Sequence, residues 1–210
     1  MKLLRVGEKG KEKPAILDGD GKIRDISSHV SDLNPHNLNF ETISKIQSVD
    51  TSSLPEISPG QRVGSCITSP GKFVAIGLNY SDHAAEVGAE IPKEPIMFMK
   101  ATSSMCGPND DVEIVSGSKK LDWEVELGIV IGKEAKHISE DQSQDHILGY
   151  CLVNDVSERE WQIEKMGQWV KGKSHDTYGP TGPYLVTKDE IKDINNLKMM
   201  LDVNGERMQT

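Results

Sequence analysis

Asp122-Trp123-Glu124-Val125-Glu126-Leu127-Gly128-Ile129-Val130-Ile131 has the clearest pattern in the chain, because polar and apolar residues alternate along it. A period of two predicts a β-strand with one apolar and one acidic face. Carboxylates on one strand face repel each other, so an enclosed acidic face needs a cation. No Lys or Arg lies within the segment, and Gly128 leaves space beside the acids, as a bound ligand requires. The alternative is an amphipathic strand whose acidic face lies in water.

Strand-like runs surround this segment from residue 72 onward, separated by turns rich in glycine and proline. They cover residues 73–76, 96–99, 112–115, 123–131, 148–156 and 183–186. Helical character is confined to residues 81–87, 139–146 and 157–166. Capping-box patterns begin at Ser157 and Thr187. Many strands with few helices favour a mostly antiparallel β core over alternating β and α units.

The first part of the chain has a different pattern of apolar and turn residues. Short apolar runs flank Asp18-Gly19-Asp20-Gly21, a strong turn signal, and apolar residues at every third position over 40–46 predict a helix. A connection rich in Pro, Ser and Gly follows. The sequence therefore predicts an α+β fold, mainly β, with a small N-terminal α+β domain at residues 1–65 and a larger domain at 70–210.

The composition narrows the class of protein. The 210 residues include 24 Lys and Arg against 33 Asp and Glu, a formal charge of -9, so we expect no nucleic-acid partner and no membrane partner. No run approaches the roughly 20 apolar residues of a membrane helix, and the N-terminus lacks the apolar core of a signal peptide. Cys66, Cys106 and Cys151 are far apart, which predicts reduced thiols in a cytoplasmic protein.

A third carboxylate extends the acidic face. Asp155 closes the apolar run that begins at residue 148, just before a predicted helix. Glu124, Glu126 and Asp155, with no cysteine or histidine close by, would form an oxygen site that favours Mg²⁺, Mn²⁺ or Ca²⁺ over Zn²⁺. In the alternative interpretation, Asp155 only helps to cap the helix that follows it.

Two further positions have the residue types that catalysis uses. His83 and Glu86 lie three apart on the predicted helix 81–87, where a carboxylate beside an imidazole supports a general base, although most such pairs are surface pairs. Residues 167–174 match the phosphate-binding pattern GxxxxGK[ST], but no strand precedes them and no helix can follow, so we reject nucleotide binding. Lys173 is then either an exposed loop lysine or an ammonium group that holds a substrate carboxylate.

Together these segments resemble the fumarylacetoacetate hydrolase family. The matching motifs, in order, are Gly77-Leu78-Asn79-Tyr80 with His83 and Glu86, Phe98-Met99-Lys100, Gly107-Pro108, Asp122-Trp123-Glu124-Val125-Glu126-Leu127, Asn154-Asp155-Val156-Ser157, Gly172-Lys173-Ser174, Gly179-Pro180-Thr181-Gly182-Pro183 and Val203-Asn204-Gly205-Glu206. The opening, with Lys2-Leu3-Leu4-Arg5 and Glu12-Lys13-Pro14, resembles the subgroup that acts on 2,4-dioxo-3-deoxy sugar acids such as the fuconate and rhamnonate derivatives. Similar proteins are often labelled ureidoglycolate lyases.

The resemblance implies a mixed β-roll for the larger domain and a homodimer. It also implies a divalent-metal site, a pair that activates water, and contacts to a small 2-oxo acid substrate. The implied ligands of Mg²⁺ or Mn²⁺ are Glu124, Glu126 and Asp155, and the implied activating pair is His83 with Glu86. The implied substrate contacts are Gln162, Lys173 and, as a further contact, Lys100.

The reaction that the resemblance implies is hydrolysis of a carbon–carbon bond in a 2,4-dioxo acid, giving pyruvate and a second acid. Alternatives on the same site are a ureidoglycolate lyase and an oxaloacetate decarboxylase or tautomerase. Family members continue past the hairpin turn at Asn204-Gly205 and include a Thr-Gly-Thr-Pro-like segment that this sequence lacks. We therefore expect a roll without its C-terminal strands and an incomplete substrate pocket, which leaves a non-catalytic relative as another alternative.

Overall fold

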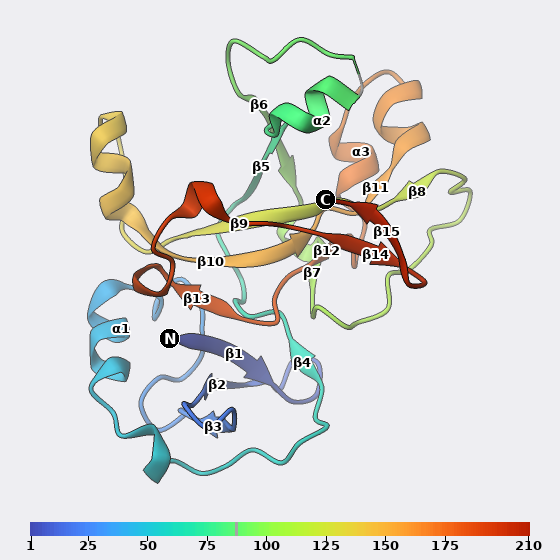
Figure 1. The fold of residues 1–210 in the computed structure, drawn as a ribbon. Coiled ribbons are helices and arrows are strands. Elements are labelled where there is room, and N and C mark those ends of the chain that lie inside the picture. The colour runs from blue at the N-terminus through green and yellow to red at the C-terminus, as the bar shows by residue number, and fades with distance from the viewer. Residues whose placement is uncertain (87) are drawn as a thin grey trace.

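Strands dominate the computed structural model, which describes residues 1–86 and 88–210 (Figure 1). The strands are β1 (Lys2–Val6), β2 (Lys13–Leu17), β3 (Ile23–Asp25), β4 (Val63–Gly64), β5 (Phe73–Gly77), β6 (Ile96–Lys100), β7 (Met105–Cys106), β8 (Leu121–Asp122), β9 (Val125–Ile131), β10 (Ile147–Asn154), β11 (Ser157–Glu158), β12 (Gly179–Pro180), β13 (Leu185–Thr187), β14 (Leu201–Val203) and β15 (Glu206–Gln209). The predicted class, α+β and mainly β, is confirmed.

The helices are short. The α-helices are α1 (Phe40–Gln47), α2 (Ser81–Glu86) and α3 (Val170–Lys173), the 3₁₀ turns are Thr51–Ser53, Thr102–Ser104, Glu140–His146, Lys188–Glu190 and Ile194–Asn196, and one π-helical turn spans Glu160–Glu164. The last residue of the predicted helix 81–87 lies outside the described residues. In the described part of the chain, no helix combines the length and apolar character needed to cross a bilayer.

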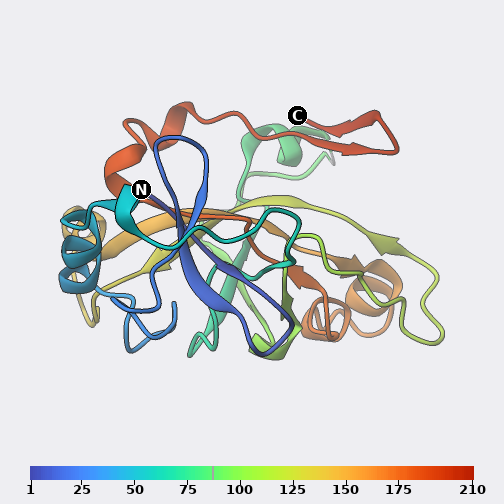
Figure 2. The ribbon, with the colours of Figure 1, turned by 90° about the horizontal axis from the view of Figure 1, so that it is seen from below.

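The main sheet runs through both predicted domains. Its strand order is β3-β2-β1-β13-β10-β9, with β4 paired to β1, and β1 places Lys2 opposite Val186 of β13. The largest buried cluster likewise combines Leu3 and Ile46 with Val130 and Leu185. Figure 2 shows the N-terminal strands crossing beneath β9 and β10. Residues 1–65 and 70–210, predicted as two domains, therefore share one sheet and one core.

A chain of ion pairs ties the first 65 residues to a loop of the larger part. The guanidinium of Arg62 donates to both carboxylate oxygens of Asp110, at 2.7 and 2.6 Å, and to Oε1 of Glu12 at 2.8 Å. Arg5 in turn contacts Glu12 at 3.4 Å and Asp32 at 2.6 Å. Opposite charges alternate along this ionic chain, so each buried charge has a partner.

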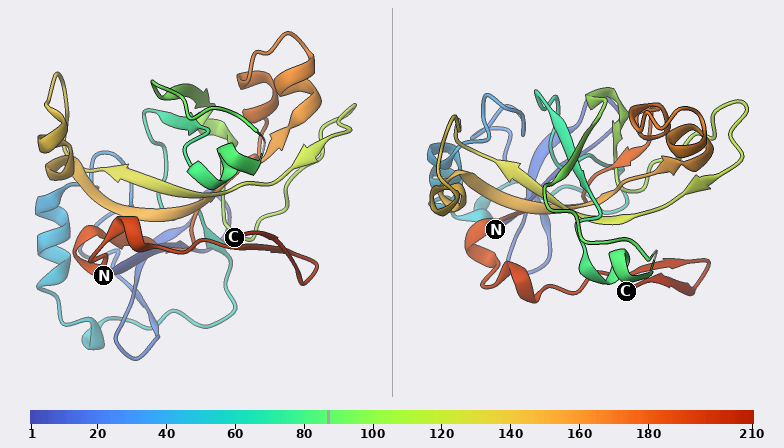
Figure 3. Two further views of the ribbon diagram at one scale, coloured as in Figure 1. Left: turned by 45° about the horizontal axis from the view of Figure 1, so that its top comes forward. Right: turned by 90° about the horizontal axis from the view of Figure 1, so that it is seen from above.

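Two antiparallel strand pairs stand apart from the main sheet. The β5–β6 pair rises above it (Figure 1), and its outer face exposes four apolar side chains, those of Val74, Ile76, Met97 and Met99. The β14–β15 hairpin lies beside α2 (Figure 3), with the hydroxyl of Tyr80 4.0 Å from the sulfur of Met199. Asn204 and Gly205 both have positive φ, 54° and 85°, which confirms the predicted two-residue turn.

Some predicted elements are absent because other contacts replace them. Residues 112–115, predicted as a strand, form no helix or strand, and the backbone N–H of Glu113 donates to the Thr177 hydroxyl at 2.8 Å. The capping box predicted at Ser157 does not form, because that residue pairs in β11.

The carboxylate of Glu158 accepts the backbone hydrogen bonds at this point of the chain. It is fully buried and accepts three backbone hydrogen bonds, from Lys119 at 3.0 Å, Lys120 at 2.7 Å and Trp161 at 2.8 Å. The predicted helix 157–166 is thereby reduced to the π-turn Glu160–Glu164. At the second predicted capping box, the Thr187 hydroxyl instead accepts a 2.6 Å hydrogen bond from the ammonium group of Met1.

Candidate active site

The predicted metal ligands lie at one end of the β9–β10 pair. Glu124 directly precedes β9, Glu126 lies within it, and Asp155 directly follows β10. The antiparallel register places Glu126 opposite Val153, and the backbone N–H of Asp155 donates to the carbonyl of Glu124 at 2.9 Å. Acids from two separate segments therefore meet where one strand begins and its neighbour ends.

Lys173 joins two of these carboxylates. Its Nζ lies 2.9 Å from Oε2 of Glu124 and 2.9 Å from Oδ2 of Asp155, and its side chain is only 2% exposed. The same ammonium group lies 5.1 Å from the centroid of the Phe98 ring, within cation–π range. Lys173 is thus a buried member of the acidic cluster and not an exposed loop lysine.

Lys100 is the second buried ammonium group. Its Nζ donates to Oδ1 of Asp155 at 2.6 Å and to the carbonyl oxygens of Val156 and Lys173 at 3.2 and 2.5 Å. An ammonium group has three N–H bonds, and all three are directed at protein oxygens here. Lys100 therefore holds two chain segments together, and its expected contact with a substrate stays a prediction. Burial opposes ionisation of Asp155, but the two lysines outweigh burial and hold its pKa below the ordinary value.

Arg159 is a site residue that the sequence analysis missed. Its guanidinium contacts Asp122 at 2.8 Å, Oε1 of Glu124 at 2.5 Å and Oε1 of Gln162 at 2.9 Å. The only signal in the sequence was its position four residues after Asp155, within a stretch interpreted as a helix cap. The acidic cluster is therefore contacted by cations from three separate segments, at Lys100, Arg159 and Lys173.

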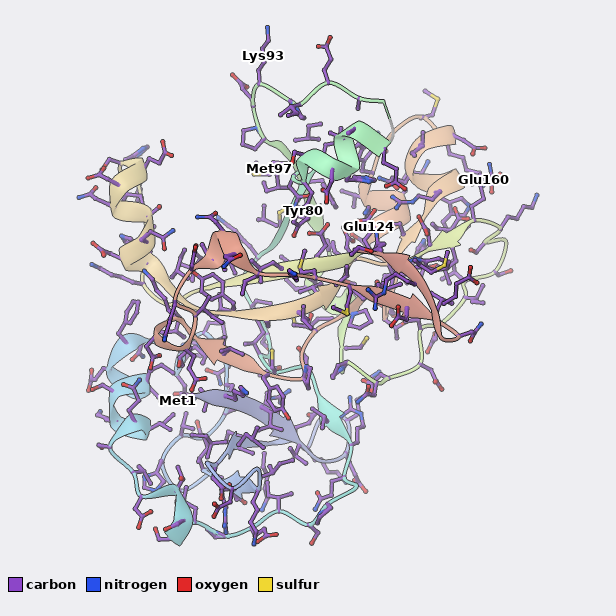
Figure 4. The ribbon with its side chains drawn as sticks, viewed as in Figure 1. Met1, Tyr80, Lys93, Met97, Glu124 and Glu160 are labelled. Atoms are coloured by element: carbon purple, nitrogen blue, oxygen red, sulfur yellow. The ribbon has the colours of Figure 1, made fainter. Side chains whose placement is uncertain are left out.

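Glu126 has a different environment from the other two acids. Its carboxylate accepts a 3.3 Å hydrogen bond from Nδ2 of Asn79, and the Tyr80 hydroxyl accepts one from the backbone N–H of Leu127 at 3.4 Å. Burial raises the pKa of Glu126, and the charges of Glu124 and Asp155 raise it further. Figure 4 shows Tyr80 and Glu124 near each other below α2.

The donor chemistry of the cluster suits a hard divalent cation. All three predicted ligands offer carboxylate oxygens, which Mg²⁺ and Mn²⁺ prefer. Within residues 1–86 and 88–210, however, no group of three or more His, Cys, Asp or Glu side chains is gathered as a metal site. Glu124 and Asp155 converge on Lys173, whereas Glu126 faces Asn79. A cation held by Glu124 and Asp155 would share their carboxylate oxygens with Lys173.

Gly128 does not provide space for a ligand. A methyl group at this position would lie 2.7 Å from Sγ of Cys151 and 2.9 Å from Cγ2 of Val153. The glycine therefore permits close packing of β10 against β9, which corrects the expectation of open space beside the acids.

The predicted general-base pair forms at the surface. Nδ1 of His83 lies 3.5 Å from Oε2 of Glu86, and the two side chains are 45% and 79% exposed. The preceding residues, Asn79 and Tyr80, contact β9 and hold the start of α2 over the acidic cluster. The pair thus lies on the element next to the carboxylates, open to water.

Gln162 lies inside the cluster. It is 3% exposed, and its side-chain carbonyl accepts the hydrogen bond from Arg159. A methyl group at Gly172 would collide with Gln162, so the π-turn packs tightly against α3. Gln162 therefore buttresses the helix that ends at Lys173, and its role as a substrate contact stays a prediction.

A hollow of about 160 Å³ lies elsewhere on the described surface. It is lined by Val125, Leu152, Asn154, Met200 and Leu201 among others. Val125 is on the opposite strand face from Glu124 and Glu126, so this hollow lies between β9–β10 and the C-terminal hairpin. We place the chemistry at the charged cluster, because the hollow has no ionisable side chain.

Similarity to known proteins extends over the whole chain. Residues 72–210 match the family described as fumarylacetoacetate (FAA) hydrolase, C-terminal. A relative from Burkholderia lata, provisionally named a hydrolase, is 54% identical over 209 residues, which are 100% of this chain and 74% of the relative.

Two solved structures show the same fold. A fumarylacetoacetate hydrolase from the psychrophilic Exiguobacterium antarcticum is 30% identical with a TM-score of 0.85, and the match covers 100% of this chain and 74% of that one. A maleylpyruvate hydrolase from Sphingobium sp. SYK-6, in complex with manganese(II) and pyruvate, is 24% identical with a TM-score of 0.81, over 100% of this chain and 75% of that one. The chain therefore belongs to the fumarylacetoacetate hydrolase family.

Proposed function

We propose that the protein is a divalent-metal-dependent hydrolase that cleaves a carbon–carbon bond of a 2,4-dioxo acid and releases pyruvate and a second acid. One observation carries this proposal: Lys173 and Lys100 are buried against the carboxylates of Glu124 and Asp155. Such a cluster suits an anionic substrate that gains negative charge during the reaction. The proposed substrates are acylpyruvates, among them the 2,4-dioxo-3-deoxy sugar acids.

Glu124, Glu126 and Asp155 would hold Mg²⁺ or Mn²⁺, with Ca²⁺ as a further candidate. When bound, such an ion supplies Lewis-acid polarisation of the 2-oxo carbonyl group. The manganese and pyruvate in the maleylpyruvate hydrolase of the same fold support this assignment.

His83 is the proposed general base. Its Nδ1 faces Glu86 at 3.5 Å, which leaves Nε2 to take a proton from water, and the Glu86 carboxylate then stabilises the resulting imidazolium. The activated water attacks the distal carbonyl, and the C3–C4 bond breaks.

Lys173 is the proposed contact for the substrate's carboxylate end. Its ammonium group is already buried beside the acids and stabilises the negative charge that develops on the pyruvate fragment. Gln162 and Arg159 lie behind it and fix the local geometry. The proposed enzyme acts as a homodimer.

Other reactions on this site differ in their products. A ureidoglycolate lyase releases urea and glyoxylate, an oxaloacetate decarboxylase releases CO₂ and pyruvate, and a tautomerase changes the keto–enol ratio without cleavage. A non-catalytic relative binds the metal without turnover. Product analysis therefore separates the hydrolase from each alternative.

The first test measures pyruvate release from acylpyruvates and 2,4-dioxo-3-deoxy sugar acids with Mg²⁺ or Mn²⁺, and with EDTA. We expect release that EDTA abolishes and that Glu124→Gln lowers by roughly 100-fold or more, because a charged group at the reacting centre is lost. The matched control is Glu41→Gln, a 79% exposed acid on α1, which should retain full activity. Metal binding without release from any of these acids would contradict the proposal.

A further inference from the structure

Trp169 lies where three elements meet. Its ring is edge-on to that of Phe98 in β6, with centroids 5.3 Å apart and planes at 66°. A methyl group at Gly77, the last residue of β5, would lie only 2.6 Å from Cζ3 and 3.1 Å from Cη2 of the same ring. The indole therefore touches the β5 backbone so closely that only glycine fits there.

Both proposed reacting groups are on elements that lead away from this contact. Gly77 leads through Leu78, whose φ of 49° lies in the left-handed region, into α2 and His83. Trp169 leads directly into α3, which ends at Lys173. The Phe98 ring that Trp169 contacts also lies 5.1 Å from the Lys173 ammonium. The same indole ring therefore contacts the strand that leads to His83 and directly precedes the helix that ends at Lys173.

The surroundings of Trp169 argue against a role in overall stability. The residue is half-buried and belongs to neither buried hydrophobic cluster among the described residues. Its neighbours are open to water, with Val170 50% and Met166 90% exposed. A change at Trp169 should therefore alter the local geometry far more than the free energy of unfolding.

We infer that Trp169 is a positioning residue, whose ring sets the separation between the segment with His83 and the helix with Lys173. This inference rests on the proposed function for the roles of those two residues. An indole suits the task because it is large and rigid, with only two side-chain torsions. Misplacement of a catalytic group by 1 Å can lower a rate by about 100-fold, so a small error here has a large effect.

The test uses Gly77→Ala, Trp169→Leu and the double variant. In Gly77→Ala the added methyl group pushes the indole and β5 apart, and we expect kcat for pyruvate release to fall by roughly 100-fold with KM changed far less. Trp169→Leu alone should also lower kcat. In the double variant the smaller leucine makes room for the methyl group, so its kcat should exceed that of Gly77→Ala by about 10-fold. If the two sites acted independently, the double variant would instead have a lower kcat than Gly77→Ala.

A second readout needs no turnover. Hydrogen–deuterium exchange of peptides covering residues 78–86 should become faster in Gly77→Ala and slow again in the double variant, while peptides from β1 and β13 stay unchanged. The matched control is Gly71→Ala, since a methyl group there meets nothing within 4 Å. It should behave as the parent in both measurements.

Two results would overturn the inference. One is a double variant whose kcat loss equals the product of the two single losses, and the other is exchange over residues 78–86 that Gly77→Ala leaves unchanged. If the parent protein cleaves none of the acids, the proposed function fails, but the exchange measurement still decides whether Trp169 positions the segment.

Discussion

The ammonium group of Lys100 donates three hydrogen bonds to protein oxygens, and its side chain is 1% exposed. Replacing it by methionine keeps the length of the side chain but leaves the carboxylate of Asp155 with one cation fewer. We expect Lys100→Met to lower the free energy of unfolding by about 3–5 kcal/mol, as loss of one partner from a buried ion pair does. Urea unfolding measures this change.

Lys45→Met is the control for that prediction. Lys45 is 71% exposed and pairs only with Glu41 one turn earlier in α1, so its removal should cost no more than about 0.5 kcal/mol. Equal unfolding midpoints for the Lys100 variant and the parent would show that the buried ammonium is not needed to hold Asp155.

Local spacing predicted some contacts among the candidate site residues and could not predict others. His83 and Glu86 were found because residues three apart on a helix are neighbours, and the structure places them 3.5 Å apart. The ion pairs that Lys100 and Arg159 form with the acids were not predicted, because these cations come from separate segments. Only the fold brings the end of β6, the β9–β10 pair and the residue before the π-turn close together.

At the scale of elements, alternating and apolar runs were reliable guides where two strands pair over a long stretch. The segment 123–131 became β9, and 148–156 became β10, each within two residues of the predicted bounds. The same signal failed at 112–115, where Thr177 supplies a hydrogen bond that a neighbouring strand would otherwise give. Periodicity reports which face is apolar, but it does not report whether a partner strand exists.

The ionic chain between the N-terminal strands and the loop at Asp110 predicts an acid-sensitive contact. The hydrogen bond from Arg62 outweighs burial and holds the pKa of Asp110 below its ordinary value of 3.8. A carboxyl group whose pKa is lower in the folded state adds stability above the unfolded value, and that stability is lost as the pH falls through the folded value. The parent should therefore be more stable than Asp110→Asn at neutral pH, with a gap that narrows below about pH 4.

Thermal unfolding at pH values between 7 and 3 measures this difference in stability between the parent and Asp110→Asn. Asp141→Asn, at an exposed position in the 3₁₀ turn Glu140–His146, is the control and should stay within about 0.5 kcal/mol of the parent at every pH. A gap that is constant across the range would mean that the Arg62 contact does not depend on the charge of Asp110.

For the whole molecule, the exposed outer face of β5–β6 supports the proposed homodimer. Val74, Ile76, Met97 and Met99 are 42%, 39%, 71% and 41% exposed on one continuous face, and contiguous apolar patches commonly mark protein contacts. We therefore expect sedimentation equilibrium to give twice the chain mass of 23.2 kDa.

Met97→Lys should shift that equilibrium toward the monomer, because a charge would then be buried at the contact. Met166→Lys changes a 90% exposed methionine on a different element and should leave the mass unchanged. Monomers at every protein concentration, or dimers that tolerate Met97→Lys, would place the contact elsewhere or exclude it.

The position of β1 also has a consequence for the protein while it is being made. The edge of β1 that faces away from β2 pairs with β13. Thr187, whose hydroxyl accepts a hydrogen bond from the Met1 ammonium group, lies 186 residues after Met1. At roughly 5–20 residues per second, a ribosome needs about 10–40 s to supply that partner. During this interval the β1–β3 meander has one strand edge without its final neighbour, a surface that invites pairing with other nascent chains. Slower translation should therefore lower the yield of folded protein.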